Sequence, residues 1–416
     1  MRAFVVHPSF VQSTGRDPAL ALAEAVSLVE ALGLEIAQAF EVPLQEPRAA
    51  TLFGSGKVSE IGKQVAEATV GLVVVDAPLT AGQQRNLETE WKCKVLDRTG
   101  LILEIFGDRA KTREGVLQVE LAHLSFQKSR LVRSWTHLER QRGGFGFLGG
   151  PGETQIEADK RALDTRIQRL RLALDRVVRT RGEHRKSRHR VPYPVIALVG
   201  YTNAGKSTLF NQLTGAAVGA KDMLFATLDP TMRALQLPSG PKAIASDTVG
   251  FISDLPTQLV AAFRATLEEV TSADLLVHVR DISHPETEHQ ATNVRGILQD
   301  LGIDEMDLED GLEVWNKVDL LPEDRYREVV AAAERRSNVV PVSAHTGVGI
   351  EVLLQEIVGC LNKSAFEDKV CVAFDDGRRR AWLFEHNLVR QERTTDTGLE
   401  FRVEWTEREK RQFDAL

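Results

Sequence analysis

A run of eight residues, Gly200 to Ser207, has the residue types and spacing needed to hold a chain of phosphates. It matches the pattern G-x-x-x-x-G-K-S. The glycines let backbone N–H groups curl around phosphate oxygens, Lys206 neutralises the β and γ phosphates, and the Ser207 hydroxyl is a ligand for Mg²⁺. Apolar residues 195–199 predict a buried strand before the run, and a helical pattern follows it, so a helix N-terminus adds positive charge. The sequence therefore predicts a phosphate-binding loop.

Three later segments occur in the order and spacing of a guanine-nucleotide hydrolase. The carboxylate of Asp247-Thr248-Val249-Gly250 is expected to hold Mg²⁺ through water, while the Gly250 N–H reaches the γ-phosphate. Asn316-Lys317-Val318-Asp319 and Ser343-Ala344 each close a predicted strand. The predicted GTP-binding residues are Gly200, Tyr201, Thr202, Asn203, Ala204, Gly205, Lys206, Ser207, Thr208, Phe225, Ala226, Thr227, Asp247, Thr248, Val249, Gly250, Asn316, Lys317, Asp319, Ser343 and Ala344.

Asp319 determines which base this site accepts. Guanine presents two hydrogen-bond donors on its Watson–Crick edge, and a carboxylate only accepts. Adenine would leave the carboxylate desolvated and unpaired, at roughly 1–3 kcal/mol for each unmet buried group. The sequence therefore predicts GTP rather than ATP.

A threonine is also needed in the first switch, the segment Leu224 to Thr231, to complete the Mg²⁺ shell. We predict Thr227, with Thr231 as the alternative. The predicted metal ligands are then Ser207, Thr227 and Asp247, and the predicted catalytic residues are Lys206, Thr227 and Gly250.

Two positions bear on the hydrolysis rate. Phe251 stands where Ras-like GTPases carry the Gln that orients the attacking water, and a phenyl ring can neither donate nor accept a hydrogen bond. We predict slow turnover in isolation, so a partner must order the switches or supply the missing group. Asn203 stands where some GTPases hold a K⁺, and a loop Asn that bonds its own backbone is about as good an interpretation.

Length and composition indicate an ordinary soluble protein of two or three domains. The 416 residues exceed one hydrophobic core, the net charge is −7, and 43% of residues are hydrophobic. No apolar run approaches the roughly 20 residues of a membrane span, and the N-terminus lacks the order of a signal peptide. Cys93, Cys360 and Cys371 are too scattered for a disulfide scaffold or a zinc site. We expect a cytoplasmic monomer, and peripheral attachment to a membrane is compatible with that.

The alternation of short apolar runs with helical patterns predicts an α/β fold in four parts. Residues 1–108 form a small parallel α/β subdomain, 109–190 a basic helical hairpin, 191–364 a doubly wound P-loop GTPase domain, and 365–416 a small α/β appendage. The first part contains predicted strands and helices in alternation: Ala3–Val6, Pro18–Leu32, Leu34–Val42, Val58–Glu67, Leu72–Val75, Ala81–Trp91 and Val95–Leu96.

Gly54-Ser55-Gly56-Lys57 looks like a second phosphate loop. However, Thr51 occupies the place of the first glycine, and Val58 occupies the place of the Mg²⁺-binding hydroxyl. We interpret this segment as a turn that enters a helix.

The hairpin is predicted from two seams of apolar residues spaced four and three apart, Leu117 to Leu138 and Leu163 to Val177, with Lys128 as the one charge in the first seam. Between them lies a loop, residues 143–154, that carries Phe145, Phe147 and Leu148. A flexible tether has little reason to expose these apolar side chains, so contact with a partner is the favoured interpretation.

Charge is concentrated in the same part of the chain. Residues 109–190 hold 20 Lys and Arg against nine Asp and Glu, in a chain that is acidic as a whole. Such a run is usually a solvated helix face, but a basic projection on an acidic protein suits RNA. Its last members are Arg179, Arg181, Arg185, Lys186, Arg188 and Arg190.

The rest of the chain continues the α/β pattern. Predicted strands are Ala243–Ala245, Leu275–Val279, Leu312–Trp315 and Val339–Val342, and predicted helices are Gln258–Val270, Thr287–Leu301 and Gly347–Leu361. In the tail we predict strands Val370–Phe374, Leu388–Arg393 and Leu399–Trp405 and a charged final helix, and Arg378-Arg379-Arg380 is either a surface contact or without a role.

Together with the nucleotide motifs, Trp135 to Gly144 and Gly150 to Gln155 resemble the HflX family within the Obg-HflX-like P-loop GTPases. The resemblance is clearest from Arg98 to Ala344. It implies a ribosome-associated GTPase that binds the large subunit and its rRNA, extends the glycine-rich loop toward the peptidyl-transferase region, and splits or rescues stalled ribosomes under stress. Phe147-Leu148 before Gly149-Gly150 makes this loop more apolar than the resemblance leads us to expect.

Other functions stay open at this point. An RNA- or tRNA-linked GTPase would share the nucleotide site, although a tRNA-modifying one should carry a reactive cysteine or a cofactor pocket. A GTP-gated scaffold would need no turnover, and Asp319 opposes an RNA-dependent ATPase.

Overall fold

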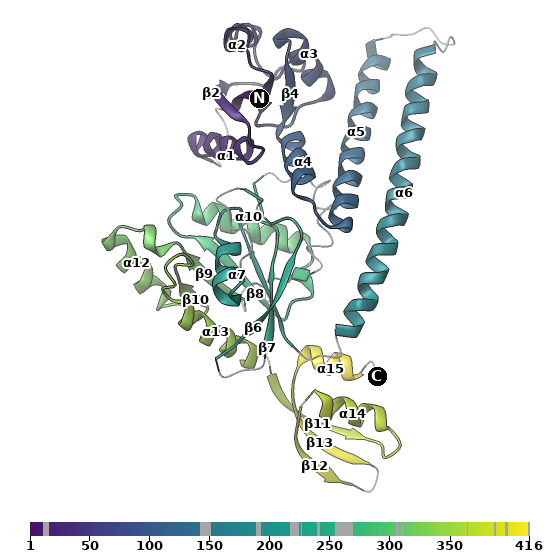
Figure 1. Ribbon diagram of the computed structural model, residues 1–416, viewed down its shortest axis with the longest axis vertical. Coiled ribbons are helices and arrows are strands. Elements are labelled where there is room, and N and C mark those ends of the chain that lie inside the picture. Colours follow the sequence, from purple (N-terminus) through teal and green to yellow (C-terminus); the bar gives the residue numbers. More distant parts are fainter. Residues whose placement is uncertain are drawn as a thin grey trace.

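The computed structural model describes residues 1–10, 16–141, 151–188, 193–216, 224–225, 227–238, 242–253, 269–304, 308, 311–363, 365–386, 388–395 and 398–414. Its α/β fold contains a four-stranded, a six-stranded and a three-stranded sheet. In Figure 1 these sheets follow one another along the long axis, and a long helical hairpin runs beside the first two. The predicted fold class is thus confirmed.

The first sheet has the order β2-β1-β3-β4, and its three pairings are all parallel. Apolar strands interleaved with helices dictate this arrangement, because parallel neighbours need a crossover between them. The elements are β1 (Arg2–Phe10), α1 (Pro18–Ala31), β2 (Glu35–Leu44), α2 (Ser55–Glu67), β3 (Leu72–Val75), α3 (Ala81–Trp91) and β4 (Lys94–Asp97). Gly54 is the N-cap of α2, as expected of a turn that enters a helix.

Helix α4 (Arg98–Arg109) was not predicted from the sequence. It follows β4 directly, and the Asp97 carboxylate caps it by accepting from the Gly100 N–H at 2.8 Å. Its residues 98–103 are all buried, including the polar ones. Its exposed residues Glu104, Gly107 and Asp108 lie at positions i, i+3 and i+4, so a helical period was present in the sequence and was missed.

The hairpin consists of α5 (Arg113–Gln141) and α6 (Pro151–Arg188). Leu124, Ile167 and Leu170 are buried between the two helices, with Leu117, Leu121 and Leu163 packed against them, and Lys128 forms an ion pair with Asp164. The predicted loop ended at Thr154, but α6 already begins at Pro151, whose fixed φ suits the first helical position. Phe145, Phe147 and Leu148 lie outside the described residues.

The second sheet has the order β10-β9-β8-β5-β7-β6 and is parallel except for its edge strand β6. This is the doubly wound arrangement, in which ligands bind at the carboxyl ends of the strands. Its elements are β5 (Val195–Gly200), α7 (Lys206–Thr214), β6 (Thr231–Gln236), β7 (Lys242–Asp247), β8 (Leu275–Asp281), α10 (Thr287–Asp300), β9 (Leu312–Asn316), the short 3₁₀ helix η1 (Val318–Leu320), α12 (Glu323–Ala333), β10 (Val339–Pro341) and α13 (Ile350–Lys363).

Strand β6 and helix α12 were not predicted, and most of the predicted helix Gln258–Val270 lies outside the described residues.

The C-terminal sheet is antiparallel, in the order β11-β13-β12. It is formed by β11 (Ala365–Val372), β12 (Val389–Thr394) and β13 (Leu399–Thr406), with α14 (Gly377–Glu385) and α15 (Glu407–Asp414). Arg378, Arg379 and Arg380 lie in the first turn of α14, a helix that was not predicted from the sequence.

Candidate nucleotide site

The phosphate-binding loop connects β5 to α7. Gly205 has φ +90°, and a Cβ there would lie 2.2 Å from the Asn316 Nδ2 atom, so only glycine fits. Lys206 is buried, and its ammonium group donates to the Gly200 carbonyl at 3.0 Å and the Tyr201 carbonyl at 2.7 Å. Burial lowers the pKa of Lys206 to about 8. A phosphate chain beside this lysine would restore the charged form.

Three oxygens of the predicted metal ligands converge beside the loop. Ser207 Oγ donates to Asp247 Oδ2 at 2.7 Å, Thr227 Oγ1 donates to the same oxygen at 2.8 Å, and the two hydroxyl oxygens lie 2.9 Å apart. Thr231, the alternative, is instead the first residue of β6. The structure therefore brings Thr227, not Thr231, to the other two ligands.

Asp247 indicates that a cation fits here. Its Oδ1 atom is buried and has no hydrogen-bond partner within the described part of the chain. Burial raises the pKa of this carboxyl group, which means that the carboxylate lacks sufficient compensation in the protein alone. Two hydroxyls and one carboxylate are hard oxygen ligands of the kind that Mg²⁺ prefers.

The predicted base-binding residues meet at the ends of β9 and β10. Asn316 donates from Nδ2 to the Ala204 carbonyl at 2.8 Å and accepts from the Ala344 N–H at 3.0 Å, so it joins the phosphate loop to the Ser343-Ala344 segment. Lys317 has φ 65° and forms an ion pair with Asp281 at 2.8 Å. Asp319 lies exposed in η1, where a base can reach its carboxylate.

The second switch begins against the phosphate loop. A Cβ on Gly250 would lie 3.0 Å from Lys206 Nζ and 2.8 Å from Thr202 Cα, so this close approach requires glycine. Phe251 donates its N–H to the Gly200 carbonyl at 3.1 Å and accepts from the Thr202 N–H at 2.7 Å. Its ring is only 2% exposed and belongs to the apolar core, so Phe251 packs beneath the switch.

The remaining predicted nucleotide-binding residues differ in how accessible their side chains are. Asn203 is exposed with φ 60°, and Thr208 is half-buried in α7. In contrast, the Thr248 hydroxyl donates to the Leu198 carbonyl at 2.6 Å, and Val249 is buried in the core. Ala226 lies outside the described residues.

The side chains of Tyr201 and Phe225 contact the N-terminal part of the chain. The Phe225 ring packs edge-to-face on Phe106, with 4.8 Å between ring centroids. Tyr201 directs its hydroxyl at Glu24 of α1, to which it donates at 2.5 Å. For both residues, only the backbone is left to contact a nucleotide.

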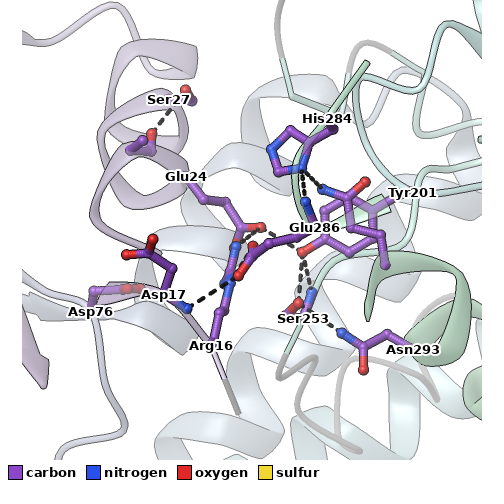
Figure 2. Close-up of polar contacts among 12 residues, drawn as sticks. Arg16, Asp17, Glu24, Ser27, Asp76, Tyr201, Ser253, His284, Glu286 and Asn293 are labelled. Carbon is purple, nitrogen blue, oxygen red and sulfur yellow. Dashed lines mark hydrogen bonds and ion pairs between the residues drawn. The ribbon is translucent and has the colours of Figure 1, made fainter. Parts of the chain in front are cut away.

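Figure 2 shows the polar network around Tyr201, which joins α1 to both nucleotide loops. The Tyr201 hydroxyl also accepts from the Ser253 N–H at 2.8 Å and contacts the Ser253 Oγ at 2.7 Å. Arg98, which is 4% exposed, donates to the Ser253 carbonyl at 3.0 Å and pairs with Glu24 and with Asp76. The N–H, the hydroxyl and the carbonyl of Ser253 in the second switch therefore all have hydrogen-bond partners.

The ion pairs of this network keep the Glu24 carboxyl group ionised. Burial by itself would raise the pKa of the Glu24 carboxyl, but Arg98 and Arg16 hold it below its ordinary value. Arg16 also contacts Glu286 at 3.1 Å, which extends the network to α10.

Sequence reasoning missed Glu24, Arg98, Ser253 and also Asp229, which is described below. They lie in different elements and match no motif. The one available signal was the tyrosine inside the phosphate loop, since a large hydroxylated ring beside a glycine-rich turn requires a partner.

Fold and site together define a P-loop GTPase, and comparison with known proteins agrees. Four family profiles match in chain order: "GTP-binding GTPase N-terminal" at residues 20–107, "GTP-binding GTPase Middle Region" at 109–188, "50S ribosome-binding GTPase" at 195–314 and "HflX C-terminal domain" at 328–415. The chain belongs to the HflX family of GTPases and hydrolyses GTP.

Relatives support this assignment over most of the chain. GTPase HflX of Magnetococcus marinus is 52% identical and covers 87% of this chain and 82% of its own length. GTPase HflX of Escherichia coli is 42% identical, with 95% and 91% covered. A crystal structure described as a complex of SsGBP with GDP has a TM-score of 0.51 at 25% identity, and covers 87% of this chain and 99% of its own. In the described residues, no helix is long and apolar enough to cross a membrane.

Proposed function

We propose that this GTPase binds the RNA of the large ribosomal subunit through its helical hairpin and splits or rescues stalled ribosomes under stress. The observation that carries the proposal is the exposed basic surface of α6. This basic surface consists of Lys160, Arg161, Arg166, Arg169, Arg171, Arg176 and Arg179, all exposed. The family profile described as "50S ribosome-binding GTPase", which matches residues 195–314, supports the same partner.

Several other basic residues of the hairpin region have structural partners. Arg130 of α5 forms an ion pair with Asp97 at 2.7 Å and donates to Leu79 O at 3.2 Å, and Arg109 donates to Ala31 O at 2.9 Å. These bonds fasten the hairpin to the N-terminal sheet. The charge excess of residues 109–190 thus serves two purposes, and α6 carries the part that is exposed to solvent.

In the nucleotide site, Lys206 neutralises the β and γ phosphates while backbone N–H groups of Gly200 to Ser207 surround them. Ser207, Thr227 and Asp247 would hold Mg²⁺, which, when bound, offsets negative charge on the phosphates. The Gly250 N–H is offered to the γ-phosphate, and Asp319 reads guanine. K⁺ near the exposed Asn203 would add positive charge between the β and γ phosphates.

The experiment is co-sedimentation with large subunits over a salt series, in the presence of a non-hydrolysable GTP analogue. The log of affinity should fall linearly with the log of salt concentration, because each phosphate contact releases counterions. Replacing Arg169, Arg171 and Arg179 by Gln should make that slope shallower by about 2 to 3, at roughly 0.7–0.9 per contact.

The matched control replaces three exposed arginines on the GTPase domain, Arg325, Arg327 and Arg335, by Gln. This variant has the same change in net charge and should keep the parent slope. Equal slopes in all three proteins would reject the proposed RNA contact.

Binding and activity are separated by a second variant. Deleting residues 145–148 removes three apolar side chains and no charge. Subunit binding should survive, while splitting of intact ribosomes, followed by sucrose-gradient sedimentation, should drop. If nucleotide affinity falls instead, the loop packs on its own protein.

A further inference from the structure

The first switch contacts the base of the hairpin as well as the metal site. Leu224, Phe225 and Leu228 are buried in the same apolar cluster as Phe106 of α4 and Val119 of α5. This places the switch directly against the junction between the two helices. None of the nucleotide motifs predicts such a contact.

Asp229 makes the polar part of this contact. Its carboxylate accepts from the Lys111 N–H at 3.0 Å, the Thr112 N–H at 2.9 Å and the Thr112 hydroxyl at 2.5 Å. Thr112 in turn begins α5, because its Oγ1 accepts from the Gly115 N–H at 3.0 Å and its carbonyl accepts from the Val116 N–H at 2.9 Å. Asp229 is therefore bound to the positive end of a 29-residue helix.

The metal-binding threonine is two residues away. Two residues span at most about 7 Å, so the place of Asp229 restricts where the Thr227 hydroxyl can lie. Phe225, two residues before Thr227, is held by Phe106. Thr227 is thus flanked on both sides by residues that are anchored to the hairpin base.

Gly115 shows how closely this joint is packed. A Cβ at position 115 would lie 2.5 Å from Asp229 Oδ1 and 3.1 Å from Thr112 Oγ1. Glycine is otherwise a poor choice in the first turn of a helix. The absence of a side chain there is what lets the Asp229 carboxylate reach the helix N-terminus.

We propose that Asp229 is a positioning residue for Thr227, and that its bonds to the start of α5 couple closure of the first switch to the placement of the hairpin. A nucleotide with a γ-phosphate orders the switch and thereby stabilises the joint. By thermodynamic linkage, whatever holds the hairpin in this position raises the affinity for that nucleotide by the same factor. The proposal rests on nucleotide binding and is independent of the ribosomal role.

The test compares affinities for a non-hydrolysable GTP analogue and for GDP, both with Mg²⁺, by titration of fluorescent nucleotides. Asp229→Ala and Thr112→Val should each lower the affinity for the analogue about tenfold, within the usual range of coupling between sites. Affinity for GDP should stay within twofold, since GDP lacks the phosphate that the closed switch contacts. Thr112 lies at the start of the hairpin helix α5, so the effect of its substitution on nucleotide affinity must pass through Asp229.

Gly115→Ala gives a variant in which helix stability and coupling change in opposite directions. Alanine favours the helix, while its methyl group displaces the Asp229 carboxylate. The proposal expects the same loss of preference for the GTP analogue, whereas a carboxylate that only caps the helix predicts no loss. This variant also keeps the test valid if Asp229→Ala fails to fold.

The control is Thr80→Val. Thr80 caps α3, the helix between β3 and β4 of the first sheet, by accepting from the Gln83 N–H at 3.2 Å. The Thr80→Val variant loses a helix cap of the same kind. Its ratio of affinities for the GTP analogue and for GDP should equal that of the parent. The double variant Asp229→Ala, Thr112→Val should lose no more than Asp229→Ala alone, because the Thr112 hydroxyl supplies one of the three hydrogen bonds that Asp229 accepts.

Hydrogen exchange supplies a readout that needs no activity. The Lys111 and Thr112 amides should exchange more slowly with the GTP analogue than with GDP, and Asp229→Ala should abolish that difference. The proposal is overturned if the two nucleotides protect these amides equally. It is also overturned if the variants weaken GDP and analogue alike or if the double variant is additive.

Discussion

At the scale of the residue, Phe251 has a clear structural role. Its ring is buried in the core beneath the second switch, and its backbone bonds to Gly200 and Thr202. The residue is 2% exposed, so Phe251→Ala would also remove core packing, at about 3–5 kcal/mol. Phe251→Leu is the better variant.

We expect Phe251→Leu to hydrolyse GTP within about threefold of the parent rate in single turnover, because no reacting group is removed. The parent itself should be slow alone and at least tenfold faster with ribosomes. Fast hydrolysis by the isolated protein, unaffected by ribosomes, would contradict this.

Asp319 should decide between bases. Asp319→Asn replaces an acceptor by an amide that also donates, so GTP binding should weaken and xanthosine triphosphate, which offers the complementary pattern, should be favoured. Competition between the two nucleotides measures this. Unchanged GTP affinity would exclude Asp319 from base recognition.

His278 of β8 should make stability depend on pH. Burial lowers its pKa to about 4, against an ordinary value of 6.5. Between these values the unfolded chain binds the extra proton, so the free energy of unfolding is greatest above pH 6.5 and falls as pH drops toward 4, by at most about 1.4 kcal/mol per pH unit. Urea unfolding of His278→Asn should show a smaller fall in this window, and the exposed His345→Asn should match the parent.

At the scale of elements, α1 and α4 hold the phosphate loop and the second switch through Tyr201. Tyr201→Phe removes one hydroxyl and leaves the Ser253 N–H and the Glu24 carboxylate without that partner, which should cost about 1–3 kcal/mol of stability. Exchange of the Ser253 amide should quicken, while GDP affinity changes little. Tyr326→Phe in α12 is the control, and an equal effect there would remove any special role from Tyr201.

At the scale of the whole molecule, the first two sheets share one apolar cluster, and among the described residues the third sheet has a cluster of its own. One cluster joins Val5 and Leu28 to Val199 and Val249, whereas Phe401 and Trp405 belong to a separate C-terminal cluster. Hydrophobic burial holds parts of a chain together only where they share a core. The N-terminal part and the GTPase part should therefore unfold together.

Truncation tests this arrangement. A chain that ends at Lys363 should stay folded and keep GDP affinity within threefold. A chain that lacks residues 1–108 should aggregate, because it exposes Phe225, which is buried in the full chain and packs on Phe106. Size-exclusion chromatography and urea unfolding provide the measurement, and a stable monomer without residues 1–108 would contradict the shared core.

The sequence by itself determined the features that depend on local spacing. Gly200–Ser207 and Asp247–Gly250 follow apolar strands, and the carboxyl ends of parallel strands meet at one edge, so their convergence was predictable. The α/β class and the hairpin seams followed in the same way, and the HflX family was indicated by the resemblance of its motifs. The start of α6 was misplaced because proline and glycine signal both loops and helix N-termini.

Only the tertiary structure decided what crosses between elements. It placed Thr227 rather than Thr231 at the predicted metal ligands, because the Thr227 hydroxyl contacts Asp247 and Ser207 whereas Thr231 begins strand β6. It buried α4 on nearly all sides, and it brought Asp229 to Thr112 across 117 positions of the chain. No periodicity or motif encodes such contacts, since they arise from how whole elements pack against one another.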